Sequence, residues 1–160
     1  AAAEGLQHFR GVSRRWDFRG SVGGVDLYDD YAHHPTEVAA MVSMAAEVAD
    51  GRLVAVFQPH LYSRTERFSS QFGTALAPAD VVVVTDVFGA REEPVPGITG
   101  ELVSDAARGS GAKEVHYVPH RADLAAYVAE LAGSGDLVLS MGAGDITLLH
   151  AELAPLLGAV

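Results

Sequence analysis

Short apolar runs of strand length, set between segments with helical periodicity, constrain the fold of this chain more than any other feature. Residues 53–57 and 81–84 are apolar at every position, as expected of strands whose two faces are both covered. Residues 36–49 carry apolar side chains at the spacing i, i+3, i+4 and i+7, at Val38, Met41, Val42 and Ala45. This alternation predicts a mainly parallel sheet covered by helices.

The same patterns divide the rest of the chain. Strands are expected at 14–19, 25–28, 53–57, 81–85, 115–118 and 137–140, and helices at 36–49, 65–76, 100–108, 121–131 and from about 145. The first two strands are expected to form a hairpin at the sheet edge, and residues 91–97 a loop. Pro155 is expected to kink or end the last helix. The predicted fold is a three-layer α/β/α, Rossmann-like domain with about six strands, mainly parallel, and an antiparallel edge element.

Composition excludes several classes of protein. Hydrophobic residues make up 49% of the 160 residues, which excludes a disordered chain. No apolar run approaches the roughly 20 residues of a membrane helix, and the N-terminus lacks a signal-peptide pattern. The net charge of −10 argues against nucleic acid or an anionic membrane as a partner. Cysteine is absent, which permits the cytoplasmic setting that we expect.

The chain opens with a segment of helical character. Residues 1–9 read as helix and 11–13 as a break, with no initiator methionine. We interpret residues 1–13 as the tail of a helix and a linker from a preceding domain, and residues 14–160 as one domain. A processed, complete protein is the alternative interpretation.

Polar residues follow the predicted strands at the points where the strands end. They occupy 29–37, 58–64, Asp86 and 141–145. Ligands of open α/β sheets gather at this edge, so we expect the turns to form one polar rim. An aspartate at a strand end, Asp29 or Asp30 here, can accept hydrogen bonds from ribose hydroxyls, and His33 and His34 can donate to a carboxylate or stack on a base. The alternative for a single aspartate is helix capping.

Arginines and glycines supply the candidate anion-binding groups. Arg64, near the start of a helix, can hold a carboxylate through two parallel hydrogen bonds. Gly142 and Gly144 can present backbone N–H groups to an anion, or simply permit a tight turn. Arg14 and Arg15 can reach a nucleotide lying between this domain and a preceding one, or belong to a charged hairpin face.

Asp29, Asp30, His33 and His34 also invite a metal-site interpretation. Two neighbouring histidines usually point apart, however, and the i, i+4 histidine pair of a zinc helix is missing. No Gly-x-x-x-x-Gly-Lys-Ser/Thr motif occurs in the chain, and no nucleophile elbow. We therefore expect no metal site, and no phosphoryl transfer by this chain alone.

Four strings of residues resemble the C-terminal domain of the Mur ligases of the UDP-N-acetylmuramate–L-alanine ligase type. They are Gly-Val-Ser-Arg-Arg-Trp-Asp-Phe at 11–18, Asp-Asp-Tyr-Ala-His-His-Pro-Thr-Glu at 29–37, Phe-Gln-Pro-His-Leu-Tyr-Ser-Arg-Thr at 57–65 and Met-Gly-Ala-Gly-Asp-Ile at 141–146. They occur in the same order as in that family and span nearly the whole chain. The second string is the most specific of the four.

The resemblance implies a three-domain cytoplasmic enzyme of peptidoglycan synthesis, with ATP and magnesium held mainly by a central domain. Its partners would be UDP-N-acetylmuramate, L-alanine and the enzyme's own N-terminal and central domains. The resemblance implies nucleotide contacts for Arg15 and Asp30, and contacts to the alanine end of the product for Tyr31, His33 and Arg64. Many relatives have arginine where this chain has Leu61. Without that second charge, Arg64 would bind the alanine carboxylate with less support.

His34, Gly142 and Gly144 are further candidates without an assigned role. Two alternative functions stay open at this point. One is a metal-dependent phosphoesterase built on the aspartate and histidine residues of 29–34. The other is a stand-alone nucleotide- or amino-acid-binding module without chemistry of its own.

Overall fold

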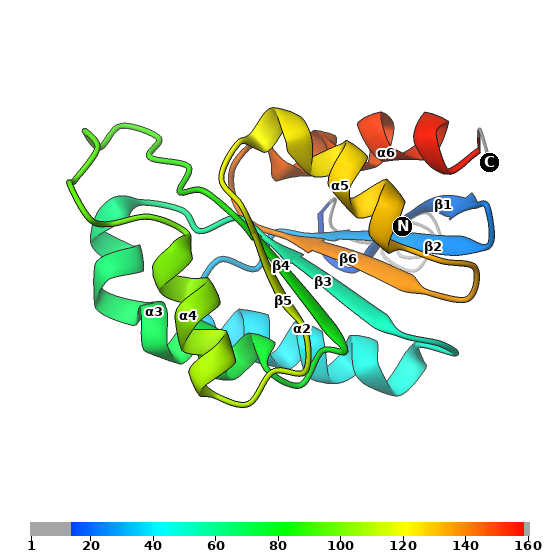
Figure 1. Cartoon of the computed structure of the whole chain (residues 1–160), viewed down its shortest axis with the longest axis horizontal. Coiled ribbons are helices and arrows are strands. Elements are labelled where there is room, and N and C mark those ends of the chain that lie inside the picture. Colours follow the sequence, from blue (N-terminus) through cyan, green and yellow to red (C-terminus); the bar gives the residue numbers. More distant parts are fainter. Residues whose placement is uncertain (1–13, 159–160) are drawn as a thin grey trace, which may run out of the picture.

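A computed structural model describes residues 14–158 of the chain (Figure 1). Its elements, in chain order, are β1 (Asp17–Val22), β2 (Val25–Asp30), α2 (Pro35–Val48), β3 (Leu53–Phe57), α3 (Tyr62–Leu76), β4 (Val81–Thr85), α4 (Glu101–Gly109), β5 (Val115–Val118), the 3-10 turn η1 (Arg121–Asp123), α5 (Leu124–Leu131), β6 (Leu137–Met141), the 3-10 turn η2 (Asp145–Leu148) and α6 (Leu149–Leu157). No helix among these residues is long and apolar enough to cross a membrane.

One six-stranded sheet has the order β1-β2-β6-β3-β4-β5. Strands β2, β6, β3, β4 and β5 are parallel to one another, and β1 pairs with β2 in the antiparallel direction at the edge. The mainly parallel sheet and the antiparallel edge hairpin are therefore confirmed. Because the central strands are parallel, their carboxyl ends and the turns that follow them lie on one side of the sheet.

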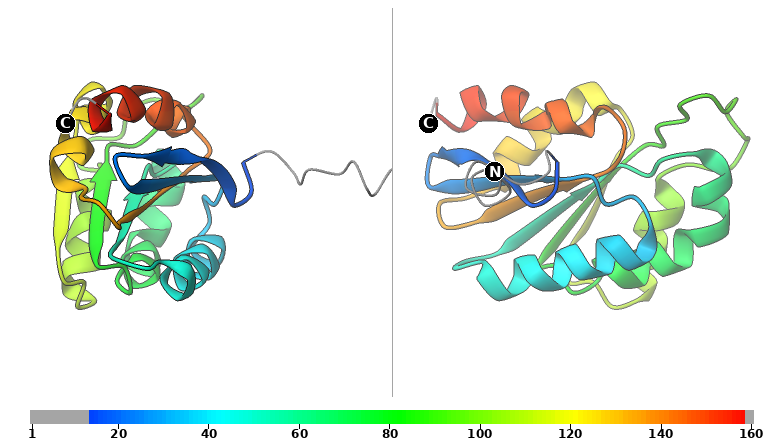
Figure 2. Two further views of the ribbon diagram at one scale, coloured as in Figure 1. Left: turned by 90° about the vertical axis from the view of Figure 1, so that its right-hand side faces the viewer. Right: turned by 180° about the vertical axis from the view of Figure 1, so that it is seen from behind.

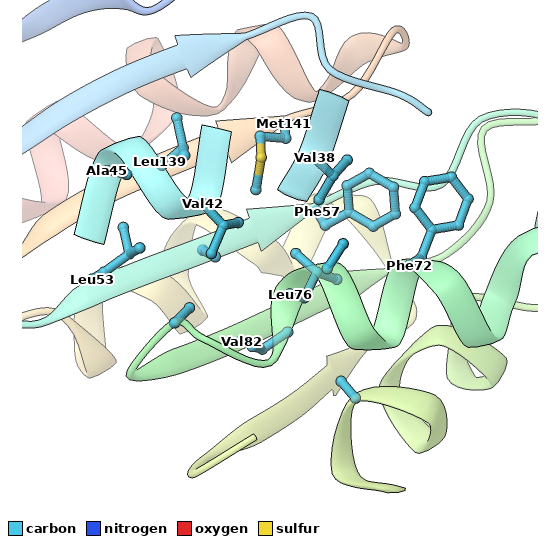
Figure 3. Packing of buried hydrophobic residues seen from close by; sticks show 14 of the residues in the cluster. Val38, Val42, Ala45, Leu53, Phe57, Phe72, Leu76, Val82, Leu139 and Met141 are labelled. Atoms are coloured by element: carbon cyan, nitrogen blue, oxygen red, sulfur yellow. The ribbon is translucent and has the colours of Figure 1, made fainter. Parts of the chain in front are cut away.

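Helices cover both faces of the sheet, as Figures 1 and 2 show. On one face, Leu53, Ala55 and Phe57 of β3 pack in the cluster that includes α2, α3 and α4. On the other face, Val54 and Val56 pack in the cluster that includes α5 and α6. Every residue of β3 is thus buried, which is why the strand reads as a continuous apolar run. Figure 3 shows the first cluster, with the Phe57 and Phe72 rings in contact.

Several predicted boundaries were wrong by a few residues. Strand β1 begins at Asp17 rather than residue 14, because Arg14 and Trp16 have φ values of 61° and 46°, outside the strand region. Helix α3 begins at Tyr62 rather than residue 65, and the last helix begins as a 3-10 turn. Pro155 lies inside α6, which ends two residues later. The helix and break expected at 1–13 lie outside the described residues.

Candidate functional site

The turns after four strands are joined to one another by backbone hydrogen bonds. The Gly142 N–H donates to the Asp30 carbonyl at 3.2 Å, the Gln58 N–H to the Met141 carbonyl at 3.0 Å, and the Phe88 N–H to the Pro59 carbonyl at 2.8 Å. We call residues 30–34, 58–64, 86–92 and 141–145 the polar rim. The rim expected from the sequence is therefore present, and it also includes the turn after β4 as far as residue 92.

Asp30 lies in this rim, but its carboxylate is already engaged. Its side chain is buried, with one oxygen accepting from the Trp16 N–H at 2.8 Å and the other from the Ala32 N–H at 2.7 Å. These bonds tie the segment before β1 to the end of β2. A ribose hydroxyl at Asp30 would use lone pairs that the two backbone donors leave available.

Asp29 points to the opposite face of the sheet, as neighbouring strand residues do. Its fully buried carboxylate accepts hydrogen bonds from Arg19 at 3.1 Å, Thr147 at 2.7 Å and Ser140 at 3.1 Å. The Arg14 guanidinium lies 3.4 Å away. Asp29 is thus the centre of a charged network that joins the edge hairpin to β6 and η2, and it does not face the rim.

Arg14 and Arg15 have different environments, which the residue pattern did not predict, although the resemblance implied a nucleotide contact for Arg15 alone. Arg14 donates to the Gly142 carbonyl at 2.6 Å, and its guanidinium lies over the Tyr31 ring, 4.9 Å from the centroid. Arg15 is exposed; its guanidinium lies 3.7 Å from the Glu37 carboxylate and 5.8 Å from the centroid of the Tyr31 ring. Arg14 therefore holds the rim together, whereas Arg15 is available to a ligand.

Tyr31 and His33 lie side by side on the rim, with their rings edge to face at 4.9 Å between centroids. The Nδ1 atom of His33 lies 2.9 Å from the Tyr31 carbonyl, and the backbone N–H groups of His33 and His34 donate to Glu37. Burial raises the pKa of Glu37, but those N–H groups and the charges of His33 and Arg15 outweigh it, so the pKa lies below its usual value. Glu37 remains a carboxylate that fixes the 31–34 turn.

Arg64 projects from the first turn of α3 toward His60. One guanidinium nitrogen lies 3.5 Å from Nδ1 of His60, whose ring stacks on Phe88 at 5.9 Å between centroids. Burial lowers the pKa of His60, and the charges of Arg64 and His33 lower it further. A neutral His60 can face the guanidinium without repelling it. The ring of His33 lies 6.0 Å from that of His60, so both histidines and Arg64 border one area.

The four residues of the metal-site interpretation do not converge. Asp29 faces its own arginine network on the far side of β2, while Asp30 accepts two backbone hydrogen bonds. His33 turns toward Tyr31, and His34 packs edge-on against Phe68, with 5.2 Å between centroids. These directions leave no centre that the four side chains share, so the geometry does not favour the phosphoesterase.

The two rim glycines are required by close packing. A Cβ atom on Gly144 would lie 2.5 Å from the Gln58 side-chain oxygen and 2.5 Å from the Phe88 ring, and one on Gly142 would lie 2.9 Å from the Gln58 carbonyl. Gln58 itself is buried, donates to Asp145 at 2.7 Å and accepts from the Ile146 N–H at 3.2 Å. Sequence reasoning missed this role of Gln58, because its partners lie 87 and 88 residues away.

A pocket of about 350 Å³ opens beside the rim, between the segment before β1 and α2. Apolar atoms form most of its wall, from Trp16, Ala40, Met41 and Met44. Arg15, Asp30 and Glu37 supply its polar groups. A largely apolar pocket with a few convergent polar groups is typical of a small-molecule binding site.

The sequence of the chain is similar to a known protein family and to curated proteins. The family model described as "Mur ligase, glutamate ligase domain" matches residues 14–144. A UDP-N-acetylmuramate–L-alanine ligase from Saccharopolyspora erythraea is 57% identical over 151 residues, which is 94% of this chain and 31% of that protein. The chain thus spans about a third of the length of the curated relatives it matches.

Solved structures show the same fold. The UDP-N-acetylmuramate-alanine ligase MurC from Thermotoga maritima superposes with a TM-score of 0.74 at 30% identity, covering 95% of this chain and 31% of that one. The MurF ligase from Thermotoga maritima in complex with ADP has a TM-score of 0.66 at 20% identity, covering 96% of this chain and 33% of that one. The second likeness concerns the fold alone.

Proposed function

Because the chain belongs to the Mur ligase family, through its glutamate ligase domain, we propose that it is the C-terminal domain of a UDP-N-acetylmuramate–L-alanine ligase. The observation that carries this proposal is the gathering of Tyr31, His33, His60 and Arg64 on one rim, in a chain 57% identical to such a ligase.

In the proposed reaction, the lactyl carboxylate of UDP-N-acetylmuramate takes the terminal phosphoryl group of ATP and becomes an acyl phosphate. The amine of L-alanine attacks the acyl carbon, phosphate leaves, and an amide bond has formed. Magnesium is expected with the ATP, held by the central domain. Peptidoglycan synthesis in the cytoplasm is the setting of this reaction.

The amino-acid pocket is assigned to Arg64, Tyr31 and His33. Arg64 offers a planar pair of donors that matches the alanine carboxylate, which a lysine would not. His60, neutral because of its lowered pKa, lies against that guanidinium. With Leu61 where many relatives have arginine, Arg64 is the cation that this turn supplies to the carboxylate.

The nucleotide is assigned to the pocket beside Asp30. Its apolar wall suits a purine, Arg15 is exposed at its edge, and Asp30 can meet a ribose hydroxyl. The phosphate groups would lie on the central domain, since this chain has no P-loop motif.

The chemistry explains why a separate domain would supply the amine. An acyl phosphate hydrolyses if water reaches it, so the cleft must close before the amine attacks. A domain that brings alanine and closes the cleft excludes water and orders the reactants in one movement. The contribution of this chain is then binding and orientation.

ATP turnover tests this proposal. The 160-residue chain alone should release phosphate from ATP no faster than buffer, because it lacks a triphosphate cradle. The enzyme that contains this chain with its preceding domains should form ADP only when UDP-N-acetylmuramate and L-alanine are both present. Robust ATP hydrolysis by the chain alone, or turnover that does not depend on L-alanine, would refute the proposal.

A further inference from the structure

The loop between β4 and α4 is bound to the rim at several points. At its base, the Asp86 carboxylate accepts from the backbone N–H groups of Val87 and Gly100, both at 2.8 Å, and so holds the two ends together. Further along, the Phe88 N–H donates to the Pro59 carbonyl and the Leu61 N–H donates to the Phe88 carbonyl at 3.0 Å. The loop is thus fixed along the turn that carries His60.

Glu92, in the same loop, caps helix α3. Its carboxylate accepts from the Ser63 N–H at 3.0 Å and from the Ser63 hydroxyl. The first N–H groups of a helix have no partner within the helix, and Leu61 at the N-cap position has no side-chain acceptor to offer. The acceptor therefore comes from a residue 29 positions away. These bonds with Ser63 lower the pKa of Glu92 and keep it ionised.

The capped turn is strained. Leu61 has φ 72° and ψ 132°, a conformation that a residue with a Cβ atom rarely adopts. Such a conformation persists only where the surroundings hold it. The Leu61 N–H donates to the Phe88 carbonyl. The Leu61 carbonyl accepts from both the N–H and the hydroxyl of Thr65. Arg64 directly follows the capped Ser63, so its direction depends on this turn.

We propose that Glu92 is a positioning residue, which fixes the first turn of α3 through Ser63 and thereby aims Arg64 at the amino-acid carboxylate. This inference rests on the proposed function of the rim. Glu92 does not contact the substrate itself. Without the Glu92 carboxylate, the turn before Arg64 can relax from its strained form. The Arg64 guanidinium then no longer meets the amino-acid carboxylate in one fixed geometry.

The test uses the full-length ligase with Glu92→Ala, and Glu93→Ala as its matched control. Glu93 is the next residue, is exposed, and carries the same charge. Glu92→Ala should raise KM for L-alanine roughly fivefold, because the Arg64 guanidinium loses its fixed geometry, while KM for ATP stays within about twofold. Glu93→Ala should leave both unchanged. Glu92→Gln, which keeps one acceptor, should recover most of the affinity for L-alanine.

A purely structural role predicts a different result, a lower melting temperature and lower kcat with KM for L-alanine unchanged. That result, or an equal rise in both KM values, would overturn the inference. If Glu92→Ala does not fold, Ser63→Ala tests the same contact, since it removes the hydroxyl donor to Glu92. It should raise KM for L-alanine by less than Glu92→Ala is expected to. An unmutated enzyme without L-alanine-dependent turnover would instead refute the proposed function.

Discussion

Replacing Arg64 with alanine in the full-length ligase is expected to raise KM for L-alanine by about 10- to 100-fold. A hydrogen bond to a charged group is worth roughly 1.5–3 kcal/mol, and each 1.4 kcal/mol corresponds to about tenfold in affinity. KM for ATP should change by no more than about twofold, because the nucleotide is assigned to the pocket beside Asp30. Steady-state kinetics with each substrate varied in turn measure both values.

Arg67 provides the control for this experiment. It is an exposed arginine one turn further along α3, with its guanidinium over the Phe68 ring at 5.2 Å. Arg67→Ala removes the same charge and should leave KM for L-alanine unchanged. Arg64→Lys keeps the charge without the planar pair of donors. Its KM for L-alanine should lie between those of Arg64→Ala and the unmutated enzyme. Equal effects of Arg64→Ala on both KM values would remove Arg64 from the alanine pocket.

Replacing Asp29 with alanine is expected to lower the free energy of unfolding of this chain by about 3–5 kcal/mol, the usual effect of removing one partner from a buried ion pair. The carboxylate is fully buried, and its loss removes the acceptor of Thr147. It also removes one partner each from Arg19, which keeps a 3.2 Å ion pair with Asp17, and from Ser140, which keeps a 3.2 Å contact with Nε2 of His150. Urea denaturation followed by circular dichroism measures the change.

Asp50→Ala removes the same charge from an exposed position after α2 and should change stability by no more than about 0.5 kcal/mol. Asp29→Asn keeps one acceptor oxygen, so its loss in free energy of unfolding should lie between those of Asp29→Ala and Asp50→Ala. A loss for Asp29→Ala as small as that for Asp50→Ala would mean that the network around Asp29 contributes little to the fold.

The central strands were predicted closely because burial on both faces leaves a continuous apolar run. Strands β3 and β4 have the predicted bounds, and so does β5 at the sheet edge. The errors fall where backbone conformation departs from regular values. Arg14 and Trp16 have positive φ and delay the start of β1. The residue types alone do not announce such angles, since neither is glycine.

The gathering of the site was predictable from topology, because parallel strands bring their carboxyl ends to one edge. The opposite directions of Asp29 and Asp30 also follow from strand alternation. The partners of individual side chains were not predictable. The Arg14 bond to the Gly142 carbonyl and the cap that Glu92 gives to Ser63 join residues 128 and 29 positions apart. Contacts of this kind depend on tertiary packing that no local pattern encodes.

A crystal structure of the full-length ligase with ADP and its amide product tests most directly whether the turns of this sheet edge form the ligand-binding surface. We expect the alanine carboxylate of the product within hydrogen-bonding distance of the Arg64 guanidinium, and the adenosine against Trp16 and Asp30. An alanine carboxylate bound elsewhere, with Arg64 facing solvent, would contradict the account.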